Sequence, residues 1–213
     1  GSIKMMTMAG SMAMADNFIY YAGWVDKVAG DLIPTWPQPA LDYAVMEPYG
    51  VIGVIIPWNV PQYNIGQVVA AALAANNCVV VKAPELAPFT VLRFGELVLE
   101  AGIPPGVVNI IPGAAETGAA MVAHAGIDKI HFIGGGNAAK AIMRSAADTL
   151  KPVTFELGGK SANVIFEDAD LSAAVPMAAF HGLGNSGQGC LVPSRLLVHD
   201  SIHDQVCLLY TSP

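Results

Sequence analysis

Basic residues are few in this sequence, and they are scattered along it. The 213 residues include 10 lysines and arginines against 17 aspartates and glutamates, which gives a net charge of −7 and a pI of about 5.0. No basic stripe is present to neutralise phosphates, and no polybasic run is present to contact an anionic lipid surface. The composition therefore argues against nucleic acid and against a membrane as partners.

Cysteine is scarce as well, with Cys78, Cys190 and Cys207 as the whole set. This odd and sparse set supplies no disulfide framework and fits a reducing compartment, so we expect a cytoplasmic protein. His199 and His203 stand four positions apart, but without further ligands they are expected on a solvated helix face. We therefore expect no bound metal.

Long uninterrupted apolar runs are missing, although hydrophobic residues make up 54% of the chain and charged residues only 13%. The most apolar stretches, 51–56 and 68–81, contain Gly53 and the pair Asn76 and Asn77, and neither reaches the roughly 18 residues of a membrane span. We expect no transmembrane helix and no signal peptide. Because residue 1 is Gly, we expect the chain to be a fragment or a processed form of a longer polypeptide.

Strand and helix patterns alternate five times over the middle of the chain. Such alternation predicts a doubly wound parallel sheet of the Rossmann-like α/β class, because parallel neighbours need crossover helices. We expect an incomplete N-terminal helix and linker at 1–49, a dinucleotide-binding domain at 50–158, and the truncated start of an α/β catalytic domain at 159–213. The expected strands are 43–48, 51–56, 78–82, 107–111, 129–133, 152–156, 163–166 and 195–198, and the expected helices are 11–29, 62–75, 90–101, 118–124, 138–147 and 171–181, with a proline-broken extended linker at 34–39.

Polar or glycine residues lie at or just past the ends of five expected strands. These residues are Asn59, Lys82, Gly113, Gly134 and Glu156. Ligands of doubly wound sheets bind at the carboxyl ends of the strands, so this pattern predicts a cofactor crevice.

A glycine turn adds to this prediction. Gly134, Gly136 and Ala139 fit the pattern G-x-G-x-x-A between a strand and a helix, where backbone N–H groups can hold a pyrophosphate. The pattern is permissive, and a plain tight strand-to-helix turn is the alternative.

Glu156 and Cys190 raise a second kind of chemistry. Glu156 lies 20 residues after Gly136, where a dinucleotide fingerprint places a ribose-binding acid. The alternative is a general base for Cys190, which lies in a glycine-lined loop 34 positions further on. Only this second role uses the carboxylate and the thiol together.

Four motifs together resemble the aldehyde dehydrogenase superfamily, in its NAD(P)-dependent hydrolytic type. They are PWNVP at 57–61, KAPE at 82–85, FELGGK at 155–160 and GQGC at 187–190, and the resemblance covers roughly residues 15–206. It implies oxidation of an aldehyde to a carboxylic acid through a thiohemiacetal and a thioester on Cys190. Asn59 and the backbone N–H of Cys190 would hold the oxyanion, and Glu156 would activate water.

The resemblance also implies a cofactor site. Lys82 and Glu85 would contact the adenosine ribose, and a carboxylate there would repel a 2′-phosphate, so we expect NAD rather than NADP. The residues expected to bind the cofactor are Ile56, Pro57, Trp58, Lys82, Glu85, Gly113, Gly134, Gly135 and Leu157.

The sequence departs from the family pattern at several points. The glycine turn lacks the Thr that the family carries just inside it, the aromatic that commonly follows Asn59 is Val60, and the family's later Glu-x-Phe motif is absent. After Val206 the sequence does not suggest the amphipathic helix with which the family continues. The alternatives are a CoA-acylating enzyme, which Glu156 disfavours, and an inactive nucleotide-binding fragment; the full-length parent is expected to be a homo-oligomer.

Overall fold

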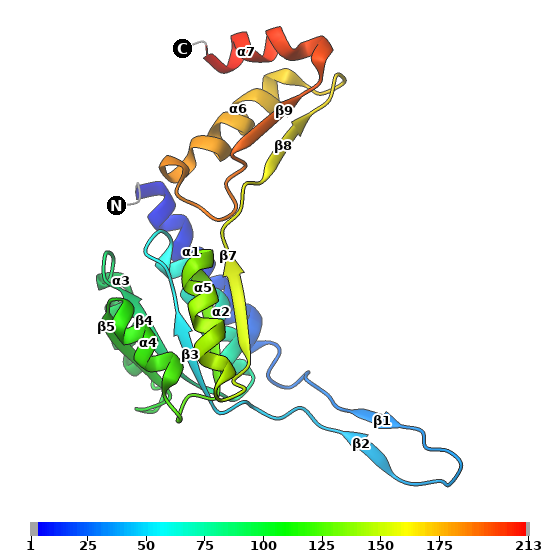
Figure 1. Cartoon of the computed structure of the whole chain (residues 1–213), viewed down its shortest axis with the longest axis vertical. Helices are drawn as coiled ribbons and strands as arrows, with labels where there is room; N and C mark the ends of the chain where they lie inside the picture. Colours follow the sequence, from blue (N-terminus) through cyan, green and yellow to red (C-terminus); the bar gives the residue numbers. More distant parts are fainter. Residues whose placement is uncertain (1–3, 212–213) are drawn as a thin grey trace. The chain divides into compact units, whose positions relative to one another are not determined.

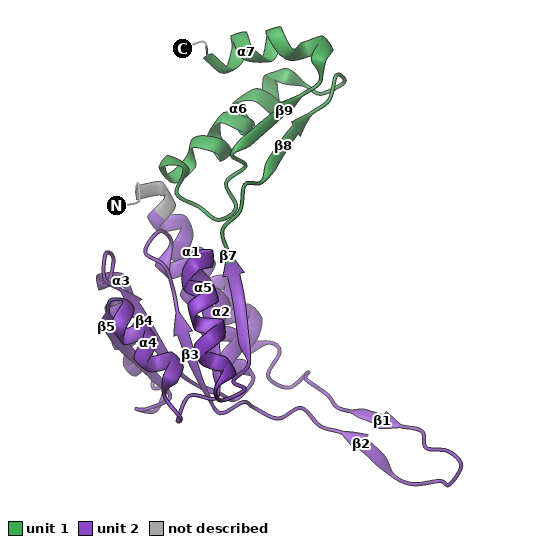
Figure 2. Cartoon of the chain, in the orientation of Figure 1, with its two compact units in different colours: residues 1–3, 157–213 green, residues 4–156 purple. Residues whose placement is uncertain are grey.

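The computed structural model describes residues 4–211 of the chain. It forms two compact units, which Figure 2 shows in different colours. Residues 4–156 form the first, here called the sheet unit, and the chain from Leu157 onward forms the second, here called the C-terminal unit. No helix within the described range is long and apolar enough to cross a membrane.

A five-stranded sheet organises the sheet unit, with the strands in the order β5-β4-β3-β6-β7. Its pairings β3 with β4, β3 with β6 and β4 with β5 are parallel, which confirms the predicted α/β class. The chain builds outward from β3 through β4 to β5 on one side (Figure 1). It then returns to the other side of β3 at β6, so a switch in winding direction lies between β3 and β6. The strands are β3 (Val51–Ile55), β4 (Cys78–Pro84), β5 (Val108–Gly113), β6 (Lys129–Gly134) and β7 (Val153–Leu157).

Helices cover both faces of this sheet because the strands carry apolar side chains on both sides. One buried cluster joins β3 and β4 to α2 and α3, with Met14 and Phe18 of α1 packed against it. The other joins β3 and β6 to α4 and α5. The helices are α1 (Lys4–Ala22), α2 (Pro61–Ala74), α3 (Phe89–Glu100), α4 (Ala115–Ala123) and α5 (Gly136–Ala147).

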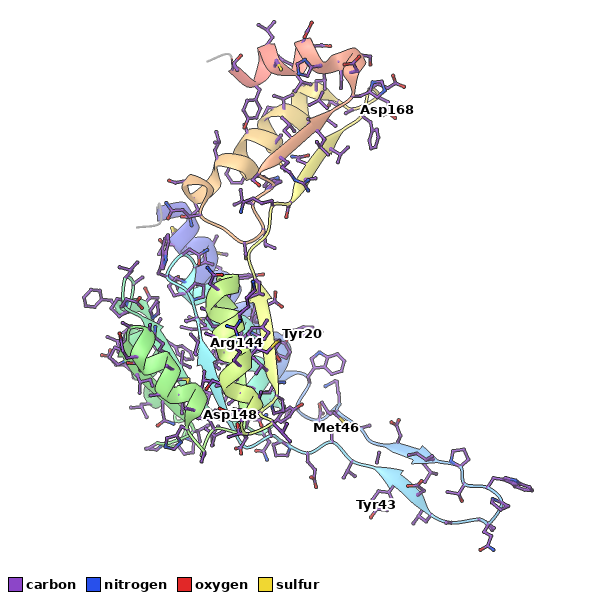
Figure 3. The ribbon with its side chains drawn as sticks, viewed as in Figure 1. Tyr20, Tyr43, Met46, Arg144, Asp148 and Asp168 are labelled. Carbon is purple, nitrogen blue, oxygen red and sulfur yellow. The ribbon has the colours of Figure 1, made fainter. Side chains whose placement is uncertain are left out.

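The N-terminal part differs from the prediction. Helix α1 ends at Ala22, and turns occupy residues 23–27 that were expected to be helical. The expected linker contains β1 (Asp31–Ile33), which pairs antiparallel with β2 (Asp42–Ala44), and β2 stops before the expected end at 48. Trp36 is 92% exposed between them, and the exposed side chains of Tyr43 and Met46 extend from this segment (Figure 3). The sequence predicts that the prolines at 34–39 interrupt regular structure, whereas in the structure they lie in the connection of a β-hairpin.

The C-terminal unit has a small core of its own. Strands β8 (Ala162–Ile165) and β9 (Arg195–Val198) pair in parallel, as a crossover through α6 (Leu171–Leu183) requires. Asp170 caps α6 by accepting from the Ser172 backbone N–H at 3.0 Å, and hydrogen bonds from Ser172 hold the pKa of this carboxyl below its usual value. The core is formed by Ile165, Val175, Ala178 and Val206.

The described residues after Val206 belong to a helix, although their sequence does not form an amphipathic pattern. Short 3₁₀ turns at Gly184–Gly187 and Asp200–Ile202 precede β9 and the last helix, α7 (His203–Thr211). Only Val206 of α7 is buried, whereas Leu208 is 68% exposed. His199 lies before this helix and not on it, so His199 and His203 do not form the expected helix face.

Candidate active site

The loop after β3 carries four of the predicted site residues. β3 has β4 on one side and β6 on the other, so this loop lies at the winding switch, where doubly wound sheets bind ligands. Ile56 is 2% exposed and completes the core, Pro57 is half-buried, and Trp58 is 43% exposed. Asn59 is half-buried, and α2 begins two residues later at Pro61.

Lys82 and Glu85 form an ion pair at the carboxyl end of β4. Lys82 Nζ lies 3.2 Å from Glu85 Oε2; the Lys82 side chain is 8% exposed, and that of Glu85 is 54% exposed. A backbone hydrogen bond at Glu85 and the bond from Lys82 hold the pKa of this carboxyl below its usual value. The buried ammonium thus fixes an ionised, solvent-facing carboxylate at the predicted ribose position.

Glycines end β5 and β6 because packing leaves no room for a Cβ there. A Cβ on Gly113 would clash with Thr117, and one on Gly134 would come within 2.6 Å of the Phe132 ring, so close packing requires glycine at both positions. Nothing lies within 4 Å of a Cβ on Gly135 or Gly136.

The open space at Gly135 and Gly136 lies over the start of α5. This helix begins at Gly136, and its N-cap residue Gly135 makes no side-chain capping bond. The first N–H groups of a helix have no partner within it and favour an anion. The geometry therefore fits a phosphate, and it distinguishes this turn from one made of glycine for packing alone.

The predicted base lies on β7, the strand beside β6. Glu156 is exposed and is the last residue of the sheet unit, and Leu157 ends the strand with 41% exposure. The sheet unit thus gathers Asn59, Lys82, Glu85 and the glycine turn at the ends of adjacent strands.

The predicted nucleophile lies in the C-terminal unit, in the loop between α6 and β9. Cys190 is exposed, and it follows a turn in which Asn185, Ser186 and Gly187 have φ of 51°, 58° and 71°. Asn185 Nδ2 donates to Gln188 O at 3.1 Å, and Gln188 N donates to Asn185 O at 3.1 Å. Left-handed residues in succession are unusual outside functional loops. Cys190 and Glu156 belong to different units, and their pairing stays a prediction.

Two further groups were not anticipated from the sequence. His131 of β6 is largely buried with its Nε2 unpartnered, and desolvation lowers its pKa to about 4.

Cys207 Sγ lies 3.6 Å from His203 Nε2 on α7, a contact that their spacing of four residues on a helix makes possible. Residues 4–211 contain no group of three or more Cys, His, Asp or Glu that could hold a metal.

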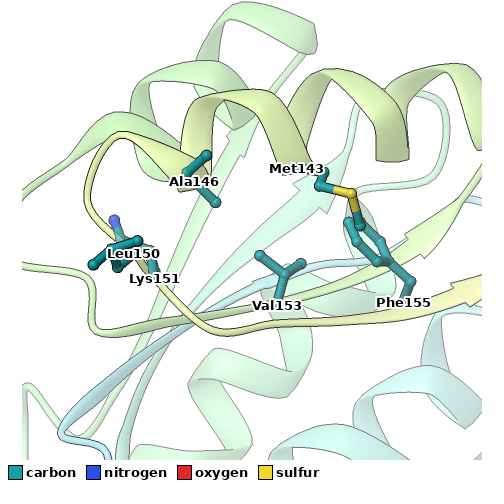
Figure 4. A pocket seen from close by; sticks show the side chains of 7 residues that line it. Met143, Ala146, Leu150, Lys151, Val153 and Phe155 are labelled. Atoms are coloured by element: carbon teal, nitrogen blue, oxygen red, sulfur yellow. The ribbon is translucent and has the colours of Figure 1, made fainter.

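A hollow of about 350 Å³ lies elsewhere, between α5 and β7 (Figure 4). It contains none of the predicted site residues. Lys151 beside it is 8% exposed and donates through Nζ to the carbonyl oxygens of Val122 and His124, each at 2.8 Å. Burial lowers the pKa of this ammonium, which serves to cap the last turn of α4. The hollow is lined by Met143, Ala146, Ala147, Leu150, Lys151, Val153 and Phe155.

Comparisons with known proteins agree with this arrangement. The sequence model of the aldehyde dehydrogenase family matches residues 1–211. Human retinal dehydrogenase 2 is 47% identical over 191 residues, covering 89% of this chain and 37% of the relative. The Arabidopsis thaliana protein "Aldehyde dehydrogenase family 2 member B4, mitochondrial" is 46% identical over 190 residues, covering 88% of this chain and 35% of the relative.

A solved structure is similar as well. The NAD⁺ complex of aldehyde dehydrogenase from Bacillus cereus superimposes with a TM-score of 0.90 at 43% sequence identity, over 93% of this chain and 40% of that one. The chain spans between 23% and 38% of the length of the first curated relatives it matches.

Proposed function

This chain belongs to the aldehyde dehydrogenase family. From that membership we propose that the protein containing this chain oxidises an aldehyde to a carboxylic acid with NAD(P)⁺. The observation that carries the proposal is the edge of the sheet where Asn59, the Lys82–Glu85 pair and the uncapped start of α5 meet the winding switch. A dinucleotide-dependent oxidation needs an amide donor for the oxyanion, an acceptor for ribose hydroxyls and a site for phosphate. Asn59, the Glu85 carboxylate and the start of α5 would supply these three parts.

In the proposed mechanism the Cys190 thiolate adds to the aldehyde carbon and forms a thiohemiacetal. The side-chain amide of Asn59, with the backbone N–H of Cys190, donates to the oxygen on which negative charge develops. A nicotinamide bound at the sheet edge would accept a hydride from this carbon, which would leave a thioester on Cys190. Glu156 takes a proton from water, which attacks the thioester and releases the carboxylate and the free thiol.

The residues of the sheet unit fit the cofactor in a simple way. The open space over Gly135 and Gly136 would take the pyrophosphate against the N–H groups of α5. Glu85 would accept from the ribose hydroxyls and repel a 2′-phosphate, which favours NAD over NADP. The remaining contacts proposed for the cofactor come from Ile56, Pro57, Trp58, Lys82, Gly113, Gly134 and Leu157.

A second candidate function is transfer of the acyl group to CoA in place of water. Glu156 is the residue against it, because a carboxylate that activates water serves hydrolysis and has no role in acyl transfer to a thiol. Product formation that stops when CoA is withheld would favour this candidate, and acid formation without CoA favours hydrolysis.

The test uses the longest polypeptide that carries this chain, mixed rapidly with aldehyde and NAD⁺. We expect a burst of NADH that is absent in Cys190→Ala, since hydride loss requires the thiohemiacetal. An equal burst in Cys190→Ala would contradict the proposal. The 213-residue chain alone is expected to be weakly active or inactive, because it spans less than two fifths of the matched relatives.

We further propose a cytoplasmic location, from the sparse cysteines, and a homo-oligomeric parent. The exposed apolar side chains of the hairpin support an oligomer, with Leu32 at 74% and Trp36 at 92% exposure. Light scattering of the parent at micromolar concentration would return more than one chain per particle; a monomer would contradict this.

A further inference from the structure

Two asparagines of the sheet unit are equally buried but differ in their hydrogen bonding. Asn64 and Asn77 are each 4% exposed. Asn77 Nδ2 donates to Ala72 O and Ala75 O, both at 3.1 Å, and its Oδ1 accepts from Gly50 N at 3.0 Å. The side-chain nitrogen of Asn64 has no hydrogen-bond partner. A buried donor without an acceptor costs about 1–3 kcal/mol, so folding alone does not explain an asparagine at position 64.

The two asparagines also lie at opposite edges of the sheet. Asn77 precedes β4 at the amino edge of the sheet, where the strands begin. Asn64 lies in the first turns of α2, at the carboxyl edge, where ligands of such sheets bind. At 1.5 Å per residue it lies roughly 6 Å along the helix axis from Val60, the neighbour of Asn59. The unpartnered donor is therefore carried by the first turn of the helix that follows Asn59.

The same side of α2 carries other polar groups. Asn64 and Gln67 share a helix face because they are separated by three residues. Gln67 Nε2 donates to Tyr63 Oη at 3.0 Å, one turn apart on the helix. The opposite side is apolar, with Ile65 among the fully buried core residues. Asn64 is thus the buried member of this polar side of α2.

We propose that Asn64 donates a hydrogen bond to an oxygen of the aldehyde substrate itself, a few bonds beyond the carbonyl carbon. The substrate class is then an aldehyde that carries an ether, hydroxyl or carbonyl oxygen on its chain, in preference to a plain alkyl aldehyde. The inference rests on the proposed function, in which Asn59 holds the carbonyl oxygen. Binding this substrate would satisfy the buried donor, which a methylene at the same place leaves unpaired.

Two aldehydes that differ in one atom test the proposal. 4-Methoxybutanal and hexanal have the same chain length, and the first carries an ether oxygen where the second has a methylene; neither can cyclise. In the longest polypeptide that carries this chain, kcat/KM should favour 4-methoxybutanal by about tenfold, which is the effect of one well-made hydrogen bond. In Asn64→Leu the preference should disappear.

Asn77→Leu is the matched control. It should leave the preference unchanged and lower Tm, whereas Asn64→Leu should raise Tm because it removes an unsatisfied buried group. If Asn64→Leu does not fold, Asn64→Ala is compared in the same way.

The outcomes separate this inference from the proposed function. An unchanged preference in Asn64→Leu, with both aldehydes still oxidised through Cys190, overturns the role of Asn64 and leaves the dehydrogenase proposal standing. Failure of the unmodified protein to oxidise either aldehyde counts against the proposed function. The corresponding acids then provide the readout: 4-methoxybutanoate should raise Tm more than hexanoate does, and equal shifts overturn the inference.

Discussion

At the amino edge of the sheet, where the strands begin, polar side chains pair with backbone groups. Asn77 holds the Gly50 N–H, Asp128 accepts from Val51 N at 2.8 Å, and Lys151 donates to two carbonyl oxygens at the end of α4. At the carboxyl edge, Asn64 keeps an unpartnered donor, and α2 and α5 start without a side-chain cap. The protein satisfies these groups at one edge of the sheet, and at the other edge it leaves the donor of Asn64 unpaired.

The comparison teaches how to separate structural from functional polar residues without a bound molecule. Burial alone does not do so, since Asn64 and Asn77 are buried to the same degree. Hydrogen-bond satisfaction does, because a group that folding leaves unpaired is costly unless something else pairs it. Changes at the carboxyl edge should therefore affect activity and spare stability, and changes at the amino edge should do the reverse.

The largest expected effect is that of Asn59→Ala on turnover. Removing one oxyanion donor lowers kcat by about 10²–10³-fold in enzymes that use one. We expect a loss of this size in the full-length polypeptide, with Tm within a few degrees of the unmodified protein, from steady-state kinetics and thermal melts. A loss of less than tenfold would remove Asn59 from the oxyanion site.

His131, in the interior between the two edges, should make stability fall in acid. Its folded pKa of about 4 lies below the ordinary 6.5, so the unfolded state binds the proton more readily. Its contribution is fully present above pH 6.5 and is lost as the pH falls toward 4, by about 3 kcal/mol in total. Urea unfolding of wild type and His131→Leu from pH 8 to pH 4 checks this; parallel curves for the two proteins would contradict it.

Lys151→Met tests the amino edge. The substitution keeps the length of the side chain but leaves the carbonyl groups of Val122 and His124 without their donor. We expect a loss of about 1–3 kcal/mol in the free energy of unfolding, with unchanged NAD⁺ affinity of the folded protein. Weakened NAD⁺ binding at full stability would show that the two edges are not separate in function.

Of these substitutions, Glu85→Gln should change the free energy of unfolding least, because the carboxylate is more than half exposed. It should shift cofactor choice, because the charge that would repel a 2′-phosphate is removed while the size of the side chain is kept. The ratio of kcat/KM for NAD⁺ over NADP⁺ should fall by about tenfold, as for the loss of one close charge interaction. An unchanged ratio would place the ribose elsewhere.

The strands of the sheet could be predicted because their sequences are locally decisive. Residues 51–56 are a largely β-branched apolar run, and such short runs are typical of strands buried on both faces. The hairpin of β1 and β2 was missed because Asp31–Ile33 and Asp42–Ala44 are short and exposed and depend on pairing with each other. Helix α7 was missed because its apolar residues do not form one stripe.

The candidate site shows the same limit. The motifs around Asn59, Lys82 and Glu156 could be recognised because short runs of sequence, in a fixed order, resemble those of a known family. Asn64 could not, because the absence of a partner depends on how α2 packs and leaves no mark on the sequence. The same holds for His131, whose pKa depends on burial from neighbouring elements.

Titration of the chain with NAD⁺ by calorimetry, in wild type and Gly135→Asp, tests the central claim most directly. A side chain at position 135 enters open space, and aspartate at the N-cap of α5 should stabilise the helix. If the carboxyl edge is the dinucleotide site, Gly135→Asp raises Tm and abolishes NAD⁺ binding, because its carboxylate occupies the place of a phosphate. NAD⁺ binding of equal affinity in both proteins would contradict the account.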